Sequence, residues 1–378
     1  MEILFEVTRD GLSIQSGRLA PFSVRPHDHG KIELKIAVPE TGKIYLKLTY
    51  LLKKELPLMN PGYPLGFDEI LLDNEDGRNQ KALSWINRTA ETNEIVVQET
   101  DQAVILKAKD FTYTLDKRTG LFSQLLFAGR EYLNHPMELN IWRAPTDNDI
   151  KSEWKKARFD RAYTRAYQVE ILQNMYGVFL IAHTAIVANS IQKILNVNIL
   201  WKIDGNGKIC AILTVTKDTE FPVLPRFGLR MFLNKKLENV SFFGFGPQES
   251  YRDKHQGASH GLYHANVKGL HEDYIRPQEN GSHFDCDFVE LSASQFGITA
   301  VSEEPFSFNA SCYTQEELEK TAHNYELTES DSLVFCLDYA QNGIGSNSCG
   351  PTVLKEYQFD ESSFQFRFEL IPFVRRSL

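Results

Sequence analysis

Apolar and polar residues alternate at every second position over long parts of this chain, and that pattern decides its class of fold. In KIELKIAV (31–38), the branched apolar residues fall on one side and the lysines and glutamate on the other. The segment 43–50 repeats the pattern after a Thr-Gly turn. Successive side chains of a β-strand point to opposite faces, so a period of two predicts strands that are buried on one face.

Further strands are expected along most of the chain. Asp10-Gly11 separates FEVTR from LSIQS, and this dipeptide is typical of tight β-hairpins. Strand patterns return after residue 94, with a turn expected at 116–120; the clearest segments are VFLIAHTAIV, ILNVNILWKI, CAILTVTK and FQFRFELIPF. Aromatic residues make up 12% of the chain, which also favours strands.

Helical patterns are few. Residues 152–163 could form a short charged helix. Thr314 with Glu317 forms a capping box that predicts a helix of about three turns over QEELEKTAH. Because helices do not alternate with strands, neither a (β/α)8 barrel nor a doubly wound sheet fits. The sequence therefore predicts an all-β protein.

The polar stretch DNEDGRNQKALSWINRTAETNE divides the 378 residues into two predicted domains. Residues 1–92, with short strands and turns that contain proline and glycine, are expected to form an antiparallel sandwich. Residues 93–378 are expected to form a larger sandwich of two sheets.

Charge and composition exclude several classes of protein. Lys and Arg total 41 against 50 Asp and Glu, a net charge of −9 without a basic run, so neither nucleic acid nor an anionic membrane surface is an expected partner. No apolar run approaches the ~18 residues of a membrane-spanning helix. The five cysteines are far apart without a C-x-x-C pair, which indicates reduced thiols in a cytoplasmic protein and no zinc site.

Residues 142–149, WRAPTDND, place an arginine and two carboxylates in one loop. Asp147 and Asp149 could bind a hard cation or the hydroxyl groups of a sugar if the turn directs both to the same side. Alternatively, both aspartates cap turns and pair with Arg143.

Two other loops combine glycine and proline with polar groups: residues 244–253, GFGPQESYRD, which include Glu249, and residues 277–281, PQENG. Rigid loops often carry binding groups, so each is either a sugar-contacting loop or a structural turn. Five histidines between 255 and 283 lack the spacing of a metal site. A His–Glu pair among them could do acid–base work on a sugar, and ordinary surface or core histidines are the alternative.

Residues 343–351, GIGSNSCGP, form a glycine-rich loop that is expected to approach another segment closely. Cys349 has no histidine beside it in the sequence, which gives little reason to expect a nucleophile there.

Taken in order, six motifs resemble the C-terminal domain of large cytosolic β-galactosidases of glycoside hydrolase family 2; they are RAPTDND, LPRFGLR, GFGPQESYRD, RPQENG, YTQEELEKTAH and GIGSNSCGP. This part is called the small-chain domain where the enzyme is split into two subunits, and the resemblance covers residues 93–378. Residues 1–92 resemble the immunoglobulin-like domain that precedes it in the family. The first strand of that domain is missing here, so we expect a fragment of a longer protein.

The resemblance implies an all-β chain in which a truncated immunoglobulin-like sandwich precedes a large supersandwich similar to galactose mutarotase. It implies no catalytic residue in this chain, because the family's retaining hydrolysis uses two glutamates on a (β/α)8 barrel that the chain lacks. It also implies no metal or other cofactor in this chain, since magnesium and sodium belong mostly to the missing part. The implied partners are a galactoside substrate, the missing N-terminal catalytic portion or large subunit, and further copies in an oligomer.

In well-known members of the family, a loop of this domain offers a tryptophan to the galactoside as an apolar platform. The matching loop here, 343–351, is one residue shorter and has Cys349 at the tryptophan position. This change forfeits about 1 kcal/mol or more of aromatic contact. The residues expected to contact substrate are Asn347, Ser348, Cys349, Arg143, Asp147 and Glu249.

The function implied is therefore to complete the sugar pocket of an enzyme that hydrolyses terminal β-galactosides such as lactose, and to supply assembly contacts. The alternatives are a stand-alone aldose mutarotase-like enzyme and a carbohydrate-binding module. The two classes differ in what the isolated chain does: the first alternative turns over a free sugar, and the second only binds one.

Overall fold

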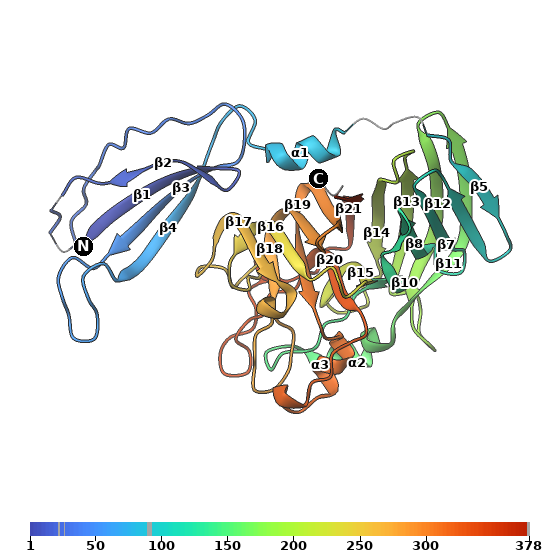
Figure 1. The fold of residues 1–378 in the computed structure, drawn as a ribbon. Coiled ribbons are helices and arrows are strands. Elements are labelled where there is room, and N and C mark those ends of the chain that lie inside the picture. Colours follow the sequence, from blue (N-terminus) through green and yellow to red (C-terminus); the bar gives the residue numbers. More distant parts are fainter. Residues whose placement is uncertain (22, 26, 89–92, 376–378) are drawn as a thin grey trace.

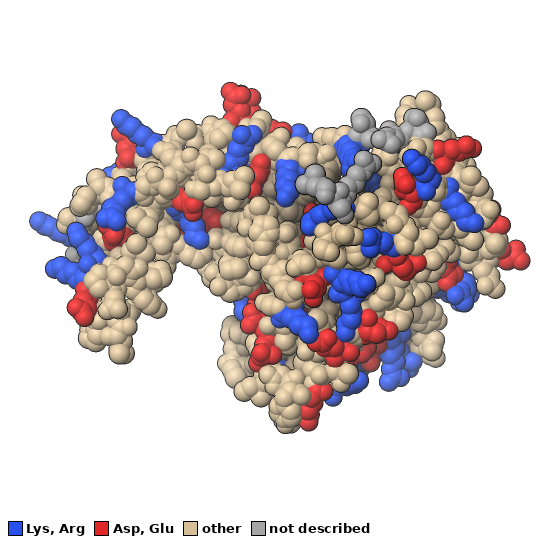
Figure 2. Space-filling model, in the orientation of Figure 1, with Lys and Arg blue, Asp and Glu red and all other residues tan. Residues whose placement is uncertain are grey.

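The computed structural model of the chain describes residues 1–378 except residues 22, 26, 89–92 and 376–378. Three β-sheets contain most of its regular structure (Figure 1), so the predicted all-β class is confirmed. Among the residues described, no helix combines the length and the apolar character that crossing a membrane requires. Figure 2 shows Lys and Arg side chains interspersed with Asp and Glu over most of one face, and a surface of mixed sign favours neither polyanions nor polycations.

The first sheet is antiparallel and has four strands in the order β2-β1-β3-β4. Its strands are β1 (Glu2–Arg9), β2 (Leu12–Arg18), β3 (Ile44–Leu51) and β4 (Pro64–Leu72). The expected hairpin joins β1 to β2, because Asp10 and Gly11 both have positive φ, 50° and 82°, as a two-residue hairpin turn requires. Val7, Ile44 and Leu46 form a small buried cluster on one face of this sheet.

The expected strand at 31–38 is wrong, since this segment forms no backbone ladder. Leu34 and Ile36 instead pack against the buried cluster of the first sheet. The Gln15 side chain holds the segment in place by donating to Lys35 O (3.2 Å) and accepting from Ala37 N (3.1 Å). The alternation of apolar residues at 31–38 thus reflects packing of the segment against a sheet face. In the described part of residues 1–92, one sheet is present, and this segment covers one of its faces.

The polar stretch expected to separate the domains contains helix α1 (Gln80–Ile86). Asn79 caps the helix, because its side-chain oxygen accepts a hydrogen bond from Ala82 N (3.1 Å). Trp85 packs edge-on against Phe288, with 5.0 Å between the ring centroids. Seven residues are too few to display a helical repeat, so the sequence did not reveal α1. The predicted domain boundary at residue 92 lies outside the described residues.

The rest of the chain forms two sheets. The smaller one has the order β5-β6-β7-β8-β9. Its strands are β5 (Val96–Glu99), β6 (Ala103–Lys107), β7 (Phe111–Asp116), β8 (Leu121–Phe127) and β9 (Arg130–Glu131). The turn expected at 116–120 joins β7 to β8.

The larger sheet has twelve strands in the order β10-β15-β20-β19-β21-β14-β13-β12-β11, and β18, β16 and β17 extend from β19. These strands are β10 (Leu133–Asn140), β11 (Tyr163–Asn174), β12 (Gly177–Val187), β13 (Leu195–Ile203), β14 (Ile209–Lys217), β15 (Arg226–Leu233), β16 (Asn239–Gly246), β17 (Ser259–Asn266), β18 (Ser282–Ser292), β19 (Phe296–Ser311), β20 (Leu333–Gln341) and β21 (Ser363–Val374). The segments singled out as the clearest strands correspond to β12, β13, β14 and β21, so those predictions are confirmed.

The smaller sheet packs against the larger one and shares its core. Trp201 lies edge-on to Phe122, with 5.1 Å between the ring centroids, and donates from Nε1 to Gly120 O (2.9 Å). The Tyr113 hydroxyl donates to Gly207 O (2.8 Å), which joins the two sheets a second time. The buried polar groups at this contact therefore have partners, as a dry core requires.

Helix α2 (Lys151–Lys156) is shorter than the expected 152–163 segment. The chain leaves the helix because Arg158 adopts left-handed backbone (φ 58°), and a 3-10 turn, η1 (Phe159–Arg161), follows. The other 3-10 turns are η2 (Val267–Leu270), η3 (Asn324–Glu326) and η4 (Lys355–Tyr357).

Helix α3 (Gln315–Lys320) begins as the capping box predicts, because the Thr314 hydroxyl oxygen accepts from Glu317 N (3.1 Å). The expected length of about three turns is wrong, since the helix has six residues. The Glu317 carboxylate also accepts from Thr328 N (3.0 Å), which fixes the chain as it turns back. Helices α2 and α3 lie at the same end of the large sheet (Figure 1).

The first sheet contacts the large one through β17 and β18. Tyr45 stacks on His260, with 4.4 Å between the ring centroids. His260 bonds Glu69 of the first sheet through Nδ1 (3.1 Å) and Asp285 of the large sheet through Nε2 (2.6 Å). Aromatic stacking and charge pairing thus join the two parts of the chain.

Candidate functional site

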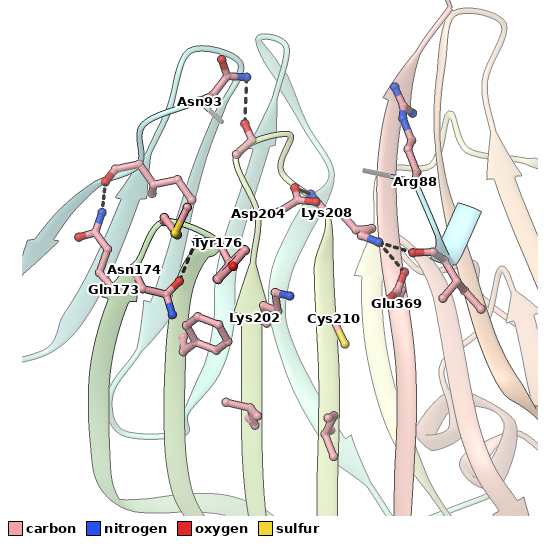
Figure 3. A pocket seen from close by; sticks show the side chains of 18 of the residues that line it. Arg88, Asn93, Gln173, Asn174, Tyr176, Lys202, Asp204, Lys208, Cys210 and Glu369 are labelled. Carbon is pink, nitrogen blue, oxygen red and sulfur yellow. Dashed lines mark hydrogen bonds and ion pairs between the residues drawn. The ribbon is translucent and has the colours of Figure 1, made fainter. Parts of the chain in front are cut away.

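A large cavity of about 910 Å³ lies over β12, β13, β14 and β21, beside the chain that leaves α1 (Figure 3). Several of its polar groups bond one another or the backbone: Lys208 pairs with Glu369 (3.1 Å), and Gln173 Nε2 donates to Ile95 O (2.8 Å). None of the residues expected to contact substrate lines this cavity. The motif residues expected to bind a sugar therefore lie at a different site from this cavity.

The loops that carry the motifs meet at one end of the large sheet. Antiparallel neighbours bring together the end of β10 at Asn140, the start of β15 at Arg226 and the end of β20 at Gln341. The loop before β18 joins them through Glu279 N, which donates to Ala144 O (2.9 Å). Segments that are far apart in the sequence thus form one loop cluster.

Arg143 is fully buried and joins the loop 143–149 to the loop 343–351. Its Nη1 donates to Asn342 O (2.6 Å) and its Nη2 to Gly343 O (3.1 Å). The Asp149 carboxylate accepts from Nη2 (2.6 Å) and Nε (3.1 Å). Burial lowers the pKa of Arg143, but Asp149 outweighs that effect and the pKa is raised. The alternative in which an aspartate of this motif pairs with Arg143 is confirmed for Asp149.

The two aspartates of the motif have different surroundings. The Asp149 side chain is buried and also accepts from Thr146 N (2.9 Å), whereas Asp147 is exposed at the turn. The two carboxylates thus differ in exposure, and a cation or sugar site formed by both together is not favoured. In the part of the chain that the structure describes, no group of three or more His, Cys, Asp or Glu could hold a metal ion. Contact of Asp147 with substrate stays a prediction.

The base of the loop 343–351 is held by hydrogen bonds from its backbone N–H groups to the side chain of Asp253. The carboxylate accepts from Ile344 N (2.9 Å) and Gly345 N (2.7 Å). Gly345 has a φ of 67°, and a Cβ there would lie 2.4 Å from a methyl carbon of Val353, so glycine is required. The close approach expected of this glycine-rich loop is confirmed.

Asn347, Ser348 and Cys349 lie in the exposed tip of the loop. A cavity of about 330 Å³ lies beside the loop, and Asn347 and Asp149 are among the residues that line it. Amide and hydroxyl groups of this kind can donate to and accept from sugar hydroxyls. Contact of the three tip residues with substrate stays a prediction, because no ligand is present.

Glu249 uses its carboxylate within the protein, and its side chain is buried. Oε1 accepts from Lys254 Nζ (2.5 Å) and from the Tyr274 hydroxyl, and Oε2 accepts from Gly281 N (2.9 Å). These bonds join the GFGPQESYRD and RPQENG loops to each other. Of the two alternatives left open for these loops, the geometry favours structural turns, and contact of Glu249 with substrate stays a prediction.

A second buried arginine, which the sequence analysis did not single out, connects the LPRFGLR and RPQENG motifs. Arg226 donates through Nε to Asp338 (3.1 Å), through Nη1 to both Glu279 oxygens (3.2 and 3.3 Å), and through Nη2 to Asn309 Oδ1 (2.8 Å). Burial raises the pKa of Asp338 and of Glu279, and Arg226 opposes this rise. Arg226 and Glu279 lie inside quoted motifs, whereas nothing in the sequence marks Asp338 within its strand.

Two of the five histidines have well-defined structural surroundings. The His260 side chain is 6% exposed and is bonded to carboxylates between the first sheet and the large sheet. Burial lowers the pKa of His283 to about 4, so this ring is neutral in the core. Neither lines the 330 Å³ cavity. A structural role is therefore favoured for both, with His260 bonded between the two sheets and His283 in the core.

Comparison with known proteins connects the loop cluster to a family. The family model described as "Beta galactosidase small chain" matches residues 107–370. A beta-galactosidase of Actinobacillus pleuropneumoniae is 41% identical over 375 residues, which cover 98% of this chain and 36% of that protein. A beta-galactosidase of Staphylococcus xylosus is 32% identical over 352 residues, which cover 91% of this chain and 34% of that protein. The chain thus spans about a third of the length of these relatives.

Among solved structures, a galactose 1-epimerase from Lactobacillus acidophilus NCFM matches with a TM-score of 0.41 and 7% identity, over 76% of this chain and 100% of that chain. A likeness this distant carries no argument about activity. The family model, by contrast, covers more than half of the chain and includes Arg143, Asp253 and the loop 343–351. The chain therefore belongs to the β-galactosidase small-chain family.

Proposed function

We propose that this chain is the C-terminal, non-catalytic portion of a retaining β-galactosidase that hydrolyses terminal β-galactosides such as lactose. The observation that carries the proposal is the convergence of the motifs at one end of the large sheet, where Arg143 and Asp253 fix the loop 343–351 beside a cavity of about 330 Å³. The relatives are named beta-galactosidase, and about two thirds of their length lies outside the match. In the proposal, that remainder holds the catalytic groups.

The loop supplies one wall of the sugar pocket in this proposal. The residues that contact the galactoside are those exposed at the tip of the loop, Asn347, Ser348 and Cys349. Arg143 and Glu249 act mainly by holding the loops together, since their polar atoms are engaged inside the protein. The catalytic portion and further copies of the protein are the proposed partners, and the magnesium and sodium sites belong to that other portion.

The experiment compares the isolated chain with a chimera in which the chain replaces the matching C-terminal third of the Actinobacillus pleuropneumoniae relative. We expect the chimera to hydrolyse o-nitrophenyl β-galactoside and the isolated chain not to. Replacing residues 346–350 of the chimera by a glycine-serine segment of equal length should raise KM roughly fivefold or more, equivalent to about 1 kcal/mol of lost hydrogen bonding.

Three results would contradict the proposal: hydrolysis by the isolated chain, a folded but inactive chimera, or a loop variant with unchanged KM. Polarimetry on fresh α-galactose tests the mutarotase alternative in the same preparation. Faster mutarotation with the isolated chain would favour that alternative instead.

A further inference from the structure

Among the hydrogen bonds of the described residues, those from the exposed tip of the loop, residues 346–350, to the protein outside the loop all go to one side chain. The tip folds on itself, because Cys349 N and Gly350 N both donate to Ser346 O (3.1 and 2.6 Å). The outside contact is Asn148, whose Oδ1 accepts from Ser348 N (3.0 Å) and from the Ser348 hydroxyl (2.8 Å). One amide group therefore supplies the hydrogen bonds that hold the tip to the protein outside the loop.

The same amide also bonds the base of the loop. Asn148 Nδ2 donates to Gly345 O (2.8 Å), and Gly345 N donates to the fixed carboxylate of Asp253 (2.7 Å). An amide offers a donor and an acceptor at once, so Asn148 bonds the base and the tip together. Alanine would remove all three bonds, and aspartate would keep only the acceptor oxygen to which Ser348 donates.

The protein holds Asn148 itself in a defined place. The next residue, Asp149, is buried in the ion pair with Arg143, which in turn donates to Gly343 O at the start of the loop. Asn148 and Asn347 both line the 330 Å³ cavity. A rigid segment therefore sets where the tip lies relative to that cavity.

We propose that Asn148 is a positioning residue of the sugar pocket, which holds residues 346–350 in the location where they meet a galactoside. This inference rests on the proposed function, in which the tip contacts substrate. Without the Asn148 amide, the tip samples several positions, and substrate binding has to order it. The loss then appears in KM, because Asn148 itself takes no part in the chemical step.

The first test measures amide hydrogen exchange in the isolated chain. In Asn148→Ala, the peptide that contains Ser348 should exchange about tenfold faster, because the Ser348 N–H loses its acceptor. Asn148→Asp keeps the acceptor oxygen and should restore most of the protection. The matched control is Asn134→Ala: Asn134 bonds Asp331 O (3.3 Å) and Ser332 Oγ (3.2 Å) at the opposite end of β20, and the Ser348 peptide should not respond.

The second test measures kinetics in the chimera on o-nitrophenyl β-galactoside. Asn148→Ala should raise KM about fivefold or more while kcat changes less than about twofold, and Asn148→Asp should lie closer to the parent. Asn134→Ala should leave both constants unchanged.

The two readouts separate the inference from the proposed function. Unchanged exchange in Asn148→Ala would overturn the positioning role, whatever the kinetics. Faster exchange with an unchanged KM would show that the amide holds the tip but that the tip does not meet substrate, which overturns the proposed function and the pocket role together. Faster exchange with a raised KM supports both.

Discussion

Replacing Arg226 by methionine tests how the large sheet keeps two acids in its interior. The guanidinium is fully buried and bonds the carboxylates of Glu279 and Asp338 as well as Asn309 Oδ1 (2.8 Å). Methionine keeps much of the volume but offers no donor, so the variant leaves two buried carboxylates without their counter-ion. Breaking a buried pair in this way costs about 3–5 kcal/mol, a large share of the 5–15 kcal/mol that is typical of a folded domain.

The assay is urea unfolding at neutral pH, followed by tryptophan fluorescence. It reports the core that the smaller and the larger sheet share, because Trp142, Trp154 and Trp201 are all buried in it. The matched control, Arg118→Met, removes an arginine that pairs with a neighbouring aspartate while its side chain is 78% exposed, and we expect no measurable change. A loss below about 1 kcal/mol in Arg226→Met would refute the reasoning that the buried acids depend on this arginine.

The destabilisation in Arg226→Met should shrink as the pH falls. Burial raises the pKa of Asp338 and of Glu279 in the native protein, and removing Arg226 takes away the main charge that lowers them, although Arg143 still lowers the pKa of Glu279. A carboxyl group with a higher pKa in the folded state binds more protons there than in the unfolded state, so stability rises on acidification. Each group can recover up to about 1.4 kcal/mol per pH unit. A destabilisation that stays constant from about pH 8 to pH 5.5 would contradict this account.

Three further predictions concern the cap of α1, the ionisation of His260 and the exposure of Cys349. Asn79→Ala removes the cap of α1 and should cost about 1 kcal/mol in urea unfolding, whereas an unchanged midpoint would contradict the capping role. Burial lowers the pKa of His260, but its bonds with Asp285 and Glu69 outweigh this effect, and the pKa is raised in the folded protein. Protonated His260 therefore stabilises the fold fully below its unfolded pKa of about 6.5, and this contribution is lost as the pH rises through the folded pKa. The Tm of the parent should therefore fall more steeply from about pH 6 to pH 9 than that of His260→Gln, and equal slopes would count against the bridge. Cys349 is exposed, so peptide mapping should find it alkylated by iodoacetamide before the other thiols of the folded chain, and a different first site would contradict the placement of the loop.

The sequence predicts strands well where one face is buried along the whole segment. In β13, every second side chain from Leu195 to Ile203 is buried, and this is the pattern that the sequence displays. The same alternation misled at 31–38, because Leu34 and Ile36 cover a sheet face without entering a ladder. Helix α1 shows the opposite failure: a helix of seven residues is held by its cap and by the packing of Trp85, and neither leaves a periodic pattern.

Sequence separation decided which parts of the loop cluster could be predicted. Arg143 and Asp149 lie six residues apart in one loop, so their pairing could be stated as an alternative and is confirmed. Arg226 and Asp338 lie 112 residues apart, and only the antiparallel pairing of β15 with β20 brings them together. Asn148 lies inside a motif that was quoted, but nothing in the sequence tells that its amide reaches Ser348, 200 residues away.

Resemblance to a family identifies the loop cluster, whereas burial separates the roles of its residues. A buried charged group has to be paired, and for that reason Arg143 and Glu249 bond loop atoms and have little left to offer a sugar. Exposed groups such as Asn347 and Cys349 are accessible to a ligand, but burial does not fix their position. The proposed pocket wall needs both properties, and Asn148 connects them, because it reaches the exposed tip from a segment that the buried Arg143–Asp149 pair holds in place.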